Sequence, residues 1–389
     1  MKKDWLHIKF ADAFVLNMGK TPARAEASYW TDGIYPWVSI SDLSGDKFVT
    51  HTKEQISQKA VDETNIHLVP KGTVIMSFKL SIGKTAIAPF DLYTNEAIMA
   101  FEPKPEISVV PDFLYYYLQY YKWSGNRAVM GETMNKAVIS NSYADIPPLS
   151  IQRSIVAELD LLHSVISKKK EQLRELDNLA QSLFYQMFGD PIANPMGWEK
   201  TYLKDKVQEM FLGPFGSALK VSCYVPQDES YCMVYEQKHA IKGSLNVETH
   251  YIDQQKFNEL ERFNVRGGDF IMSCRGTIGK IYQLPQDAPL GIIHPSLMKI
   301  RLKKDSFTPC FFLSLLSKIV ANESTNGNCV QMAITAKDLG NKLIIYPPLS
   351  LQQSFAAKVS AIEAQKQAIT QSIHHSEALL AQRMDTYFS

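Results

Sequence analysis

The sequence PPLSIQRS at Pro147–Ser154 is repeated 200 residues later as PPLSLQQS at Pro347–Ser354, with six of eight positions identical. After each copy, apolar residues recur alternately four and three positions apart, a spacing typical of a coiled-coil seam. We therefore predict a long helix after each copy. Each helix should span roughly 36–40 residues, or about 55–60 Å at 1.5 Å per residue.

The two predicted seams consist of aliphatic and aromatic residues. They are Ile155, Leu159, Leu162, Ile166, Leu173 and Leu176 in the first helix, and Phe355, Val359, Ile362, Ile369, Ile373 and Leu380 in the second. Lys169 and Lys366 also fall on seam positions, where we expect them to set the register or to face a partner. Phe188-Gly-Asp-Pro191 predicts the end of the first helix. Because heptad periodicity is the same in both directions, it leaves parallel and antiparallel pairing open.

A second repeat predicts a β-hairpin in each half of the chain. Lys71–Lys84 reads KGTVIMSFKLSIGK and Gly267–Lys280 reads GGDFIMSCRGTIGK, with seven of fourteen positions identical. The first copy ends like a phosphate-binding P-loop, but Phe78 stands where that motif needs its first glycine. In the second copy Ile281 replaces Thr85, which removes the hydroxyl that a P-loop uses for Mg²⁺. We interpret both copies as a strand, a tight turn at Lys or Arg, and a second strand.

Further matches extend the repeat and predict a duplicated domain. Tyr35–Val38 matches Tyr231–Val234, and Pro111 and Pro309 each begin an apolar helix. The predicted fold class is α+β, with two globular, mixed β-rich domains that contain short helices, two long helices and a pseudo-twofold arrangement. The predicted boundaries are 1–148 for the first domain, 149–190 for the first helix, 191–348 for the second domain and 349–389 for the second helix.

The two halves diverge just before each Pro-Pro pair. We match Asn135 with Gln331 in this region. Separately, Ile139–Pro147 is five residues shorter than its counterpart Ile334–Pro347. The difference predicts that the two domains join their helices in different ways.

The composition is that of a soluble globular protein. The 389 residues are 45% apolar and 21% charged, and a formal net charge of +1 argues against a surface coated with positive charge. Five scattered cysteines form no CxxC pair, which fits reduced thiols in a cytosol. No apolar run is long enough to span a bilayer, and Asp4, His7 and Lys9 interrupt the segment where a signal peptide would be apolar. We expect a cytoplasmic protein.

The sequence offers no candidate catalytic or metal site. Ile146-Pro-Pro-Leu149 and Tyr346-Pro-Pro-Leu349 lack the polar residue and the aromatic residue that amino-methyltransferases place around a Pro-Pro pair. No Gly-rich loop opens a βαβ unit, so we expect no pocket for S-adenosylmethionine or a dinucleotide. The histidines lack metal-ligand spacing, and His374 and His375 would face different sides of a helix. We predict no catalytic residue, no metal and no cofactor in this chain.

Basic and amide-rich loops lie between the apolar strands of both halves. Arg and Lys side chains can contact guanine or phosphate, and Asn and Gln can contact adenine. The alternative is that these loops are ordinary polar surface turns. The candidate DNA-binding residues are Lys20, Thr21, Arg24, Lys79, Lys84, Asn126, Arg127, Asn135, Lys136, Ser217, Lys220, Arg275, Thr277, Lys280, Asn328 and Gln331.

Together these features resemble the specificity (S) subunit of type I restriction-modification enzymes. Two domains are each followed by Pro-Pro-Leu-Ser-x-Gln and a long helix. Gly19–Ser39 is similar to the opening of a target recognition domain, and Phe188–Trp198 is similar to the junction between the first helix and the second domain. The resemblance covers essentially the whole chain.

The resemblance implies a DNA-binding subunit of a restriction system, in which each target recognition domain reads one half of a split double-stranded DNA target. It implies that the two helices form an antiparallel coiled coil, which fixes the separation of the half-sites and docks two methyltransferase (M) subunits. The M subunits would bind S-adenosylmethionine for DNA modification at adenine N6, and separate motor-nuclease (R) subunits would use ATP and Mg²⁺. This chain would be a non-catalytic specificity subunit.

Other interpretations stay open. A type IIB-like restriction system has a specificity subunit of the same layout, and the neighbouring genes would separate the two. A coiled-coil adaptor that binds proteins would not retain DNA, whereas a DNA reader would lose affinity steeply as salt rises. An enzyme acting alone would transfer methyl groups without partners.

Overall fold

The structure is a computed structural model of the chain. It describes residues 4–79, 81–123, 126–128, 131–325 and 334–389. Contacts divide the chain into two compact units: unit 1 comprises Met1–Glu171 and Thr370–Ser389, and unit 2 comprises Gln172–Ile369. Each unit contains one globular domain and one part of each long helix.

The two long helices are α5, Leu149–Phe188, and α11, Leu349–Phe388. Gly189 follows α5 with φ +71°, a left-handed conformation that favours glycine and ends the helix, so the predicted glycine stop is confirmed. The seam residues named above are buried or half-buried on both helices.

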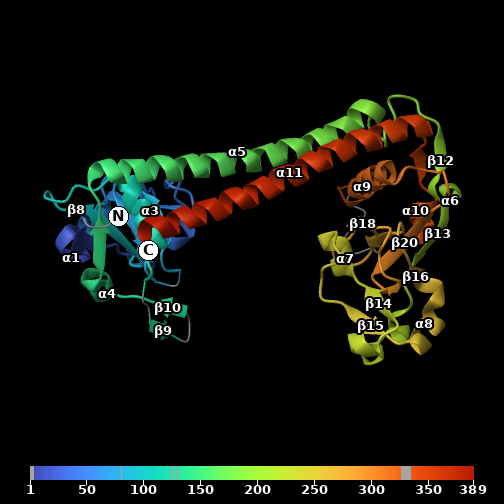
Figure 1. Ribbon diagram of the computed structural model, residues 1–389, viewed down its shortest axis with the longest axis horizontal. Coiled ribbons are helices and arrows are strands. Elements are labelled where there is room, and N and C mark those ends of the chain that lie inside the picture. The colour runs from blue at the N-terminus through green and yellow to red at the C-terminus, as the bar shows by residue number, and fades with distance from the viewer. Residues whose placement is uncertain (1–3, 80, 124–125, 129–130, 326–333) are drawn as a thin grey trace. The chain divides into compact units, whose positions relative to one another are not determined.

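In unit 1 the two helix segments pair antiparallel (Figure 1). Glu158, early in α5, forms an ion pair of 2.8 Å with Arg383, late in α11. Further along α5, Lys169 Nζ donates a hydrogen bond of 2.6 Å to Ser372 Oγ, which lies earlier in α11. Residues later in α5 therefore contact residues earlier in α11, so the two helix segments are antiparallel.

In unit 2 the same direction of pairing continues. Lys366 Nζ lies 2.7 Å from the carboxylate of Asp177, and the rings of Phe184 and Phe355 are 5.8 Å apart between centroids. The two lysines on seam positions thus each bond to the opposite helix, Lys169 to serine hydroxyls and Lys366 to a carboxylate. Both contacts can act as register markers.

Each globular domain contains a four-stranded antiparallel sheet, which we call its first sheet. In unit 1 its order is β2 (Phe14–Met18), β8 (Ile98–Pro103), β5 (Val74–Ser77) and β6 (Thr85–Ile87). In unit 2 its order is β13 (Val207–Leu212), β20 (Leu297–Leu302), β17 (Phe270–Ser273) and β18 (Ile281–Gln283). The predicted hairpins are β5–β6 and β17–β18, and both are confirmed as antiparallel pairs.

A second sheet packs on each first sheet and contains one parallel pair. In unit 1 it comprises β4 (Glu54–Ile56), β3 (Tyr35–Val38) and β7 (Tyr93–Thr94). In unit 2 it comprises β15 (His250–Ile252), β14 (Cys232–Tyr235), β19 (Gly291–Ile293) and β16 (Asn264–Val265). The parallel pairs are β3 with β7 and β14 with β19, so the duplication extends to sheet topology.

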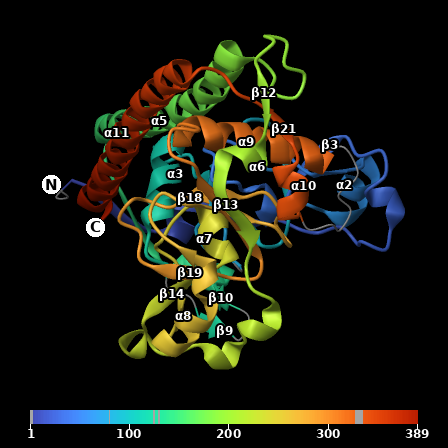
Figure 2. The ribbon, with the colours of Figure 1, turned by 90° about the vertical axis from the view of Figure 1, so that its right-hand side faces the viewer.

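Helices cover the outer faces of the two sheets. An apolar helix that begins at the predicted proline, α3 (Pro111–Tyr120) or α9 (Pro309–Thr325), packs on the first sheet. A short helix, α2 (Gln58–Thr64) or α8 (Gln254–Leu260), packs on the second sheet. Figure 2 shows this order in unit 2, from α9 through β13 and β18 to β14 and then α8.

The repeated glutamine of the Pro-Pro-Leu-Ser-x-Gln motif connects each domain to its helix. Gln152 and Gln352 are fully buried. Gln152 Oε1 accepts the Val110 N–H (2.7 Å), and its Nε2 donates to the carbonyl oxygens of Pro147 (2.7 Å) and Ser108 (3.0 Å). Because a buried amide needs partners, the motif positions the residue before α3 against the start of α5.

Gln352 repeats this arrangement in unit 2. Its Oε1 accepts the Thr308 N–H (3.0 Å), and its Nε2 donates to the Pro347 carbonyl (2.9 Å). The repeat in the sequence therefore records a repeated junction between domain and helix.

The predicted match of Asn135 with Gln331 is wrong. Asn135 caps α4 (Lys136–Asn141) by accepting the Val138 N–H, and Thr335 caps α10 (Ala336–Gly340) in the same way. Asn and Thr both supply a capping oxygen, so the position of the cap persists without sequence identity.

The predicted difference in junction length is wrong for the same reason. Counted from these caps, β11 (Tyr143–Ile146) and β21 (Leu343–Ile345) begin after the same number of residues, and each strand is followed by its long helix. They pair with β1 (Leu6–Lys9) and β12 (Lys200–Tyr202), respectively.

Within the described ranges, no helix is both long enough and apolar enough to cross a membrane.

Candidate nucleic-acid interface

The turn of each first-sheet hairpin is held by a buried serine. In unit 2, Ser273 Oγ donates to the Thr277 carbonyl (2.5 Å) and accepts the Lys280 N–H (2.9 Å). Gly279 takes φ +82° and donates its N–H to the Ser273 carbonyl (2.8 Å). This network fixes the backbone of the turn while leaving the side chains of Arg275, Thr277 and Lys280 exposed.

The turn in unit 1 has the same framework. Ser77 Oγ donates to the Ser81 carbonyl and accepts the Lys84 N–H (3.2 Å), and Gly83 takes φ +86°. The serine and glycine shared by the two sequence copies are therefore turn-forming residues. Lys79 is half-buried and Lys84 is exposed.

A second loop leaves each first sheet at the same end as the hairpin turn. The Gly213 N–H donates to the Leu297 carbonyl (2.9 Å), and Leu297 lies opposite Ser273 in the neighbouring strand. Gly19 likewise donates to Ile98 (3.1 Å), which lies opposite Ser77. With strands about 4.8 Å apart, the two loops start about 10 Å from each other. We call this end of each first sheet its loop end.

Both glycines are required by close approach of backbone. A Cβ at Gly19 would lie 2.2 Å from the Thr94 carbonyl oxygen, and a Cβ at Gly213 would lie 2.3 Å from the His294 carbonyl oxygen. Real Cβ atoms do not come this near, so only glycine lets the second loop leave the sheet beside the turn before β8 or β20.

In unit 2 the loop end is cationic. Arg275 and Lys280, on the hairpin turn, are exposed, and so is Lys220 further along the Gly213 loop; among the described residues none of the three has an acidic partner within ion-pair distance. Gln237, at the start of α7 (Gln237–Lys242), donates its Nε2 to the carbonyls of Arg275 (2.6 Å) and Thr277 (3.2 Å). The turn is thus held from outside as well as from within.

His294 adds a neutral ring to the loop end of unit 2. Its Nδ1 bonds to Ser296 Oγ (2.8 Å), and burial lowers the pKa of His294 below its ordinary value. The ring is therefore neutral near pH 7 and can serve as a hydrogen-bonding group, while the fixed positive charge comes from arginine and lysine.

In unit 1 a carboxylate pairs with the arginine of the second loop. Arg24 forms a bidentate ion pair with Glu54 and stacks on the ring of Trp30, with its guanidinium carbon 3.8 Å from the centroid. The hydrogen bond from Arg24 lowers the pKa of Glu54. Arg24 therefore has a structural role, and any contact with a ligand would use only its remaining N–H groups.

Two more candidates in this loop are also engaged. Thr21 donates its hydroxyl to the Glu96 carboxylate, and Lys20 Nζ donates to the Thr64 carbonyl (2.6 Å). Partial burial acts to raise the pKa of Glu96, but the bond from Thr21, a backbone hydrogen bond and the charges of Lys79 and Arg24 together outweigh it, so that the pKa is lowered and the carboxylate stays ionised. An ionised acceptor at this position could bond to the cytosine amino group.

The remaining candidates are placed as follows. Ser217 is exposed in the Gly213 loop, and Lys136 is exposed in the first turn of α4. Asn135 is engaged as the α4 cap. Asn126 and Arg127 belong to β9 (Asn126–Ala128), which pairs with β10 (Gly131–Thr133), and Asn328 and Gln331 lie outside the described residues.

Sequence reasoning missed Gln237 and His294. Neither is part of a repeat, and the role of each depends on the packing of one sheet on the other. It also missed the roles of Gln152 and Gln352, although their recurrence at one motif position was a usable signal.

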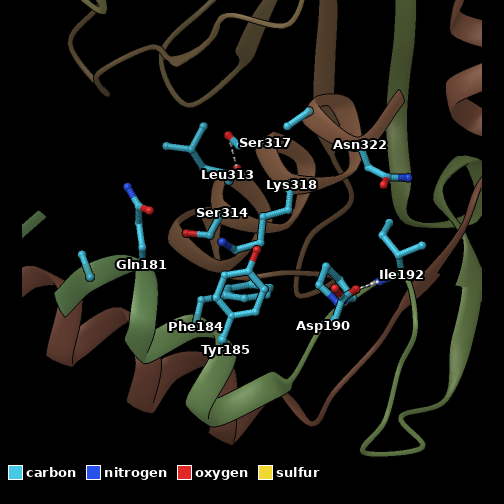
Figure 3. Close-up of a pocket in the computed structure, with 13 residues that line it drawn as sticks. Gln181, Phe184, Tyr185, Asp190, Ile192, Leu313, Ser314, Ser317, Lys318 and Asn322 are labelled. Carbon is cyan, nitrogen blue, oxygen red and sulfur yellow. Dashed lines mark hydrogen bonds between the residues drawn. The ribbon is translucent and has the colours of Figure 1, made fainter. Parts of the chain in front are cut away.

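A groove of about 650 Å³ in unit 2 lies between the end of α5, the following junction and α9 (Figure 3). Lys318 Nζ lies 4.0 Å from the ring centroid of Tyr185. The Asp190 carboxylate accepts the backbone N–H groups of Ile192 (2.7 Å) and Ala193 (3.1 Å). Both charged groups therefore have structural partners.

In the described part of the chain, no group of three or more His, Cys, Asp or Glu side chains is placed to hold a metal ion.

Comparison with known proteins agrees with this architecture. The family model of the type I restriction modification DNA specificity domain matches residues 2–178 and 234–376. The MjaIX type I restriction enzyme specificity subunit of Methanocaldococcus jannaschii is 25% identical, over 92% of this chain and 87% of that protein. The putative MjaX specificity subunit of the same organism is 22% identical, over 85% of this chain and 80% of that protein.

Solved structures share the fold. A chain from a study of complex assembly and conformational transition of the type I R-M system matches with a TM-score of 0.70 and 18% identity, over 99% of this chain and 98% of that chain. The HsdS subunit from Thermoanaerobacter tengcongensis matches with a TM-score of 0.51 and 19% identity, over 99% and 97%. Since the family model matches most of its length, this chain belongs to the type I restriction modification DNA specificity domain family and is a type I specificity subunit.

Proposed function

We propose that the loop end of each first sheet is the DNA-reading surface, and that each unit reads one half of a bipartite target. The observation that carries this proposal is the repeated construction of the loop end. In both units a turn held by a buried serine and a loop that starts at a glycine leave the sheet about 10 Å apart, and the turn carries basic side chains. That separation fits within a major groove about 12 Å wide.

The two loop ends would bind DNA by different balances of forces. Unit 2 offers arginine and lysine without acidic partners, which suits phosphate contacts and guanine. Unit 1 offers a carboxylate, Glu96, and an arginine already paired with Glu54, which suits hydrogen bonding to base edges more than phosphate neutralisation. We therefore expect the paired Arg24 to contribute less to the salt dependence of binding than Arg275.

Catalysis belongs to associated subunits in this proposal. The chain would act with M subunits that bind S-adenosylmethionine and with R subunits that use ATP and Mg²⁺, and the long helices would be both the spacer and the M-subunit docking site. Support comes from the relatives, which are specificity subunits, and from the similar chain in a structure of type I R-M complex assembly. Methyl transfer by this chain alone would refute the assignment.

The test uses the chain assembled with its M subunits, on a target identified by mapping methylated adenines in cells that carry the complete system. Lys280→Ala should weaken specific binding and lower the slope of log affinity against log salt by about 1, as expected for one lost phosphate contact. Lys304→Ala is the matched control, because Lys304 is exposed just beyond the opposite end of β20.

The proposal has clear failure points. Equal effects of the two substitutions would show that the loop end of unit 2 does not face DNA. No retention of DNA at any salt concentration would favour the protein-binding adaptor instead.

A further inference from the structure

Phe215 is unusually exposed for an aromatic residue. Its side chain is 88% exposed, the largest value among the large apolar side chains in the described residues. A phenylalanine left in water forgoes the favourable free energy of burial. Isolated exposed apolar residues are common, so the exposure matters only together with the position and rigidity of the loop that carries Phe215.

The position of Phe215 is the cationic loop end of unit 2. It follows Gly213 by two residues in the loop that starts about 10 Å from the hairpin turn bearing Arg275 and Lys280. Lys220 lies further along the same loop and is exposed. An apolar ring among unneutralised cations is a poor surface for an apolar protein partner, but it suits a polyanion with an apolar interior, which is the character of duplex DNA.

The loop holds Phe215 in place before any ligand arrives. Pro214, directly before it, is buried and has a restricted backbone. The Ala218 N–H donates to the Phe215 carbonyl (2.8 Å), and Leu219, 5% exposed, is buried in the apolar cluster under the second sheet. Phenylalanine has only two side-chain torsions, so ordering it costs little entropy.

Unit 1 has no counterpart of Phe215. The residue two positions after Gly19 is Thr21, which is half-buried and bonded to Glu96. The duplication therefore provides an internal comparison, because the same loop in the same place carries an aromatic ring in one unit and a small polar side chain in the other.

We propose that Phe215 is a wedge that inserts between two stacked base pairs of the half-site read by unit 2. This inference rests on the proposed function. Arg275 and Lys280 hold phosphates next to the inserted ring while the ring partly unstacks one step and bends the duplex. Apolar side chains that enter base steps act in this way, and pyrimidine–purine steps yield most easily. This unstacking by Phe215 is expected in only one half of the target.

The test uses the chain assembled with its M subunits and DNA that carries 2-aminopurine at one adenine position at a time. In the wild-type complex, fluorescence should rise at one step in the half-site of unit 2. Adenines extruded for methylation will also brighten, but that signal should remain in Phe215→Ala, whereas the wedge signal should disappear. Specific affinity should fall roughly 5- to 150-fold, the range for losing one aromatic stacking contact.

Two further variants separate the alternatives. Phe215→Leu keeps an apolar wedge and should retain most of the fluorescence rise. Leu343→Ala, which removes another exposed apolar side chain of unit 2, should change neither signal nor affinity. If Phe215→Ala releases the M subunits while Leu343→Ala does not, Phe215 is a protein contact and the wedge is refuted.

Failure of the wedge is distinguishable from failure of the proposed function. Specific binding by the wild type with no base step that depends on Phe215 would overturn the wedge and leave DNA reading intact. Absence of specific binding by the wild type would overturn both.

Discussion

Replacing Gln152 by alanine should loosen the junction between the domain of unit 1 and α5. Gln152 is fully buried and makes three hydrogen bonds, to Val110, Pro147 and Ser108. At about 1 kcal/mol net for each bond, the free energy of unfolding of unit 1 should fall by about 3 kcal/mol. Gln352 makes two such bonds, so Gln352→Ala should cost about 2 kcal/mol in unit 2.

Hydrogen exchange read by mass spectrometry can measure each loss in its own unit. The amides of α3 report on unit 1 and those of α9 on unit 2, and neither set bonds directly to the substituted side chain. A loss of about 3 kcal/mol should speed exchange in α3 roughly 100-fold when exchange occurs through opening of the unit. A two-state unfolding curve would be less informative, because a chain of two units need not unfold in one step.

Gln353 provides the control, because it neighbours Gln352 in the sequence and is exposed. Gln353→Ala should leave exchange in α9 unchanged. Acceleration of α3 by less than about threefold in Gln152→Ala would mean that the buried amide is not a structural link, since three net hydrogen bonds cannot be worth so little. Equal effects of the substitutions at Gln352 and Gln353 would refute the reasoning in the same way.

Three other outcomes are expected. Deleting seven residues from each long helix preserves the seam and removes about 10 Å of helix, so methylation mapping should show a gap between half-sites that is about three base pairs shorter. Binding should also be weaker, because the DNA turns by about 100° over three base pairs. An unchanged gap would exclude the helices as the spacer. Lys169→Met should leave the free energy of unfolding, followed by thermal denaturation, unchanged or slightly higher, because it replaces the bonds to Ser372 and Ser376 with an apolar seam contact. A fall in this free energy of more than about 2 kcal/mol would instead show that those bonds stabilise the helix pair. Burial lowers the pKa of His239, so that as the pH falls the unfolded chain takes up this proton before the folded chain does. The free energy of unfolding should therefore be highest above about pH 6.5 and should decline below it. Urea midpoints at pH 7.5 and 5.5 measure this decline, which should be smaller in His239→Asn.

Local spacing along the chain is enough to predict several elements of this fold. The duplicated hairpins, the prolines that begin α3 and α9, the heptad seams and the glycine stop after α5 all follow from residue periodicity and turn chemistry, which act over a few neighbouring positions. Recurrence of whole segments also showed the duplication, because two copies of one fold keep their turn-forming and junction residues. The cap before α10 escaped detection, since Thr335 performs the function of Asn135 without being identical to it.

Which of these elements come into contact depends on long-range packing. A heptad pattern has the same period in either direction, so only contacts such as Lys169 with Ser372 establish antiparallel pairing. The Gly213 loop and the hairpin turn are about 60 residues apart in the sequence, and strand register places them at one end of a sheet. Whether a basic residue is available also depends on its neighbours in space: Arg24 is paired with Glu54, whereas Arg275 has no acidic partner among the described residues, although both are arginines in polar loops.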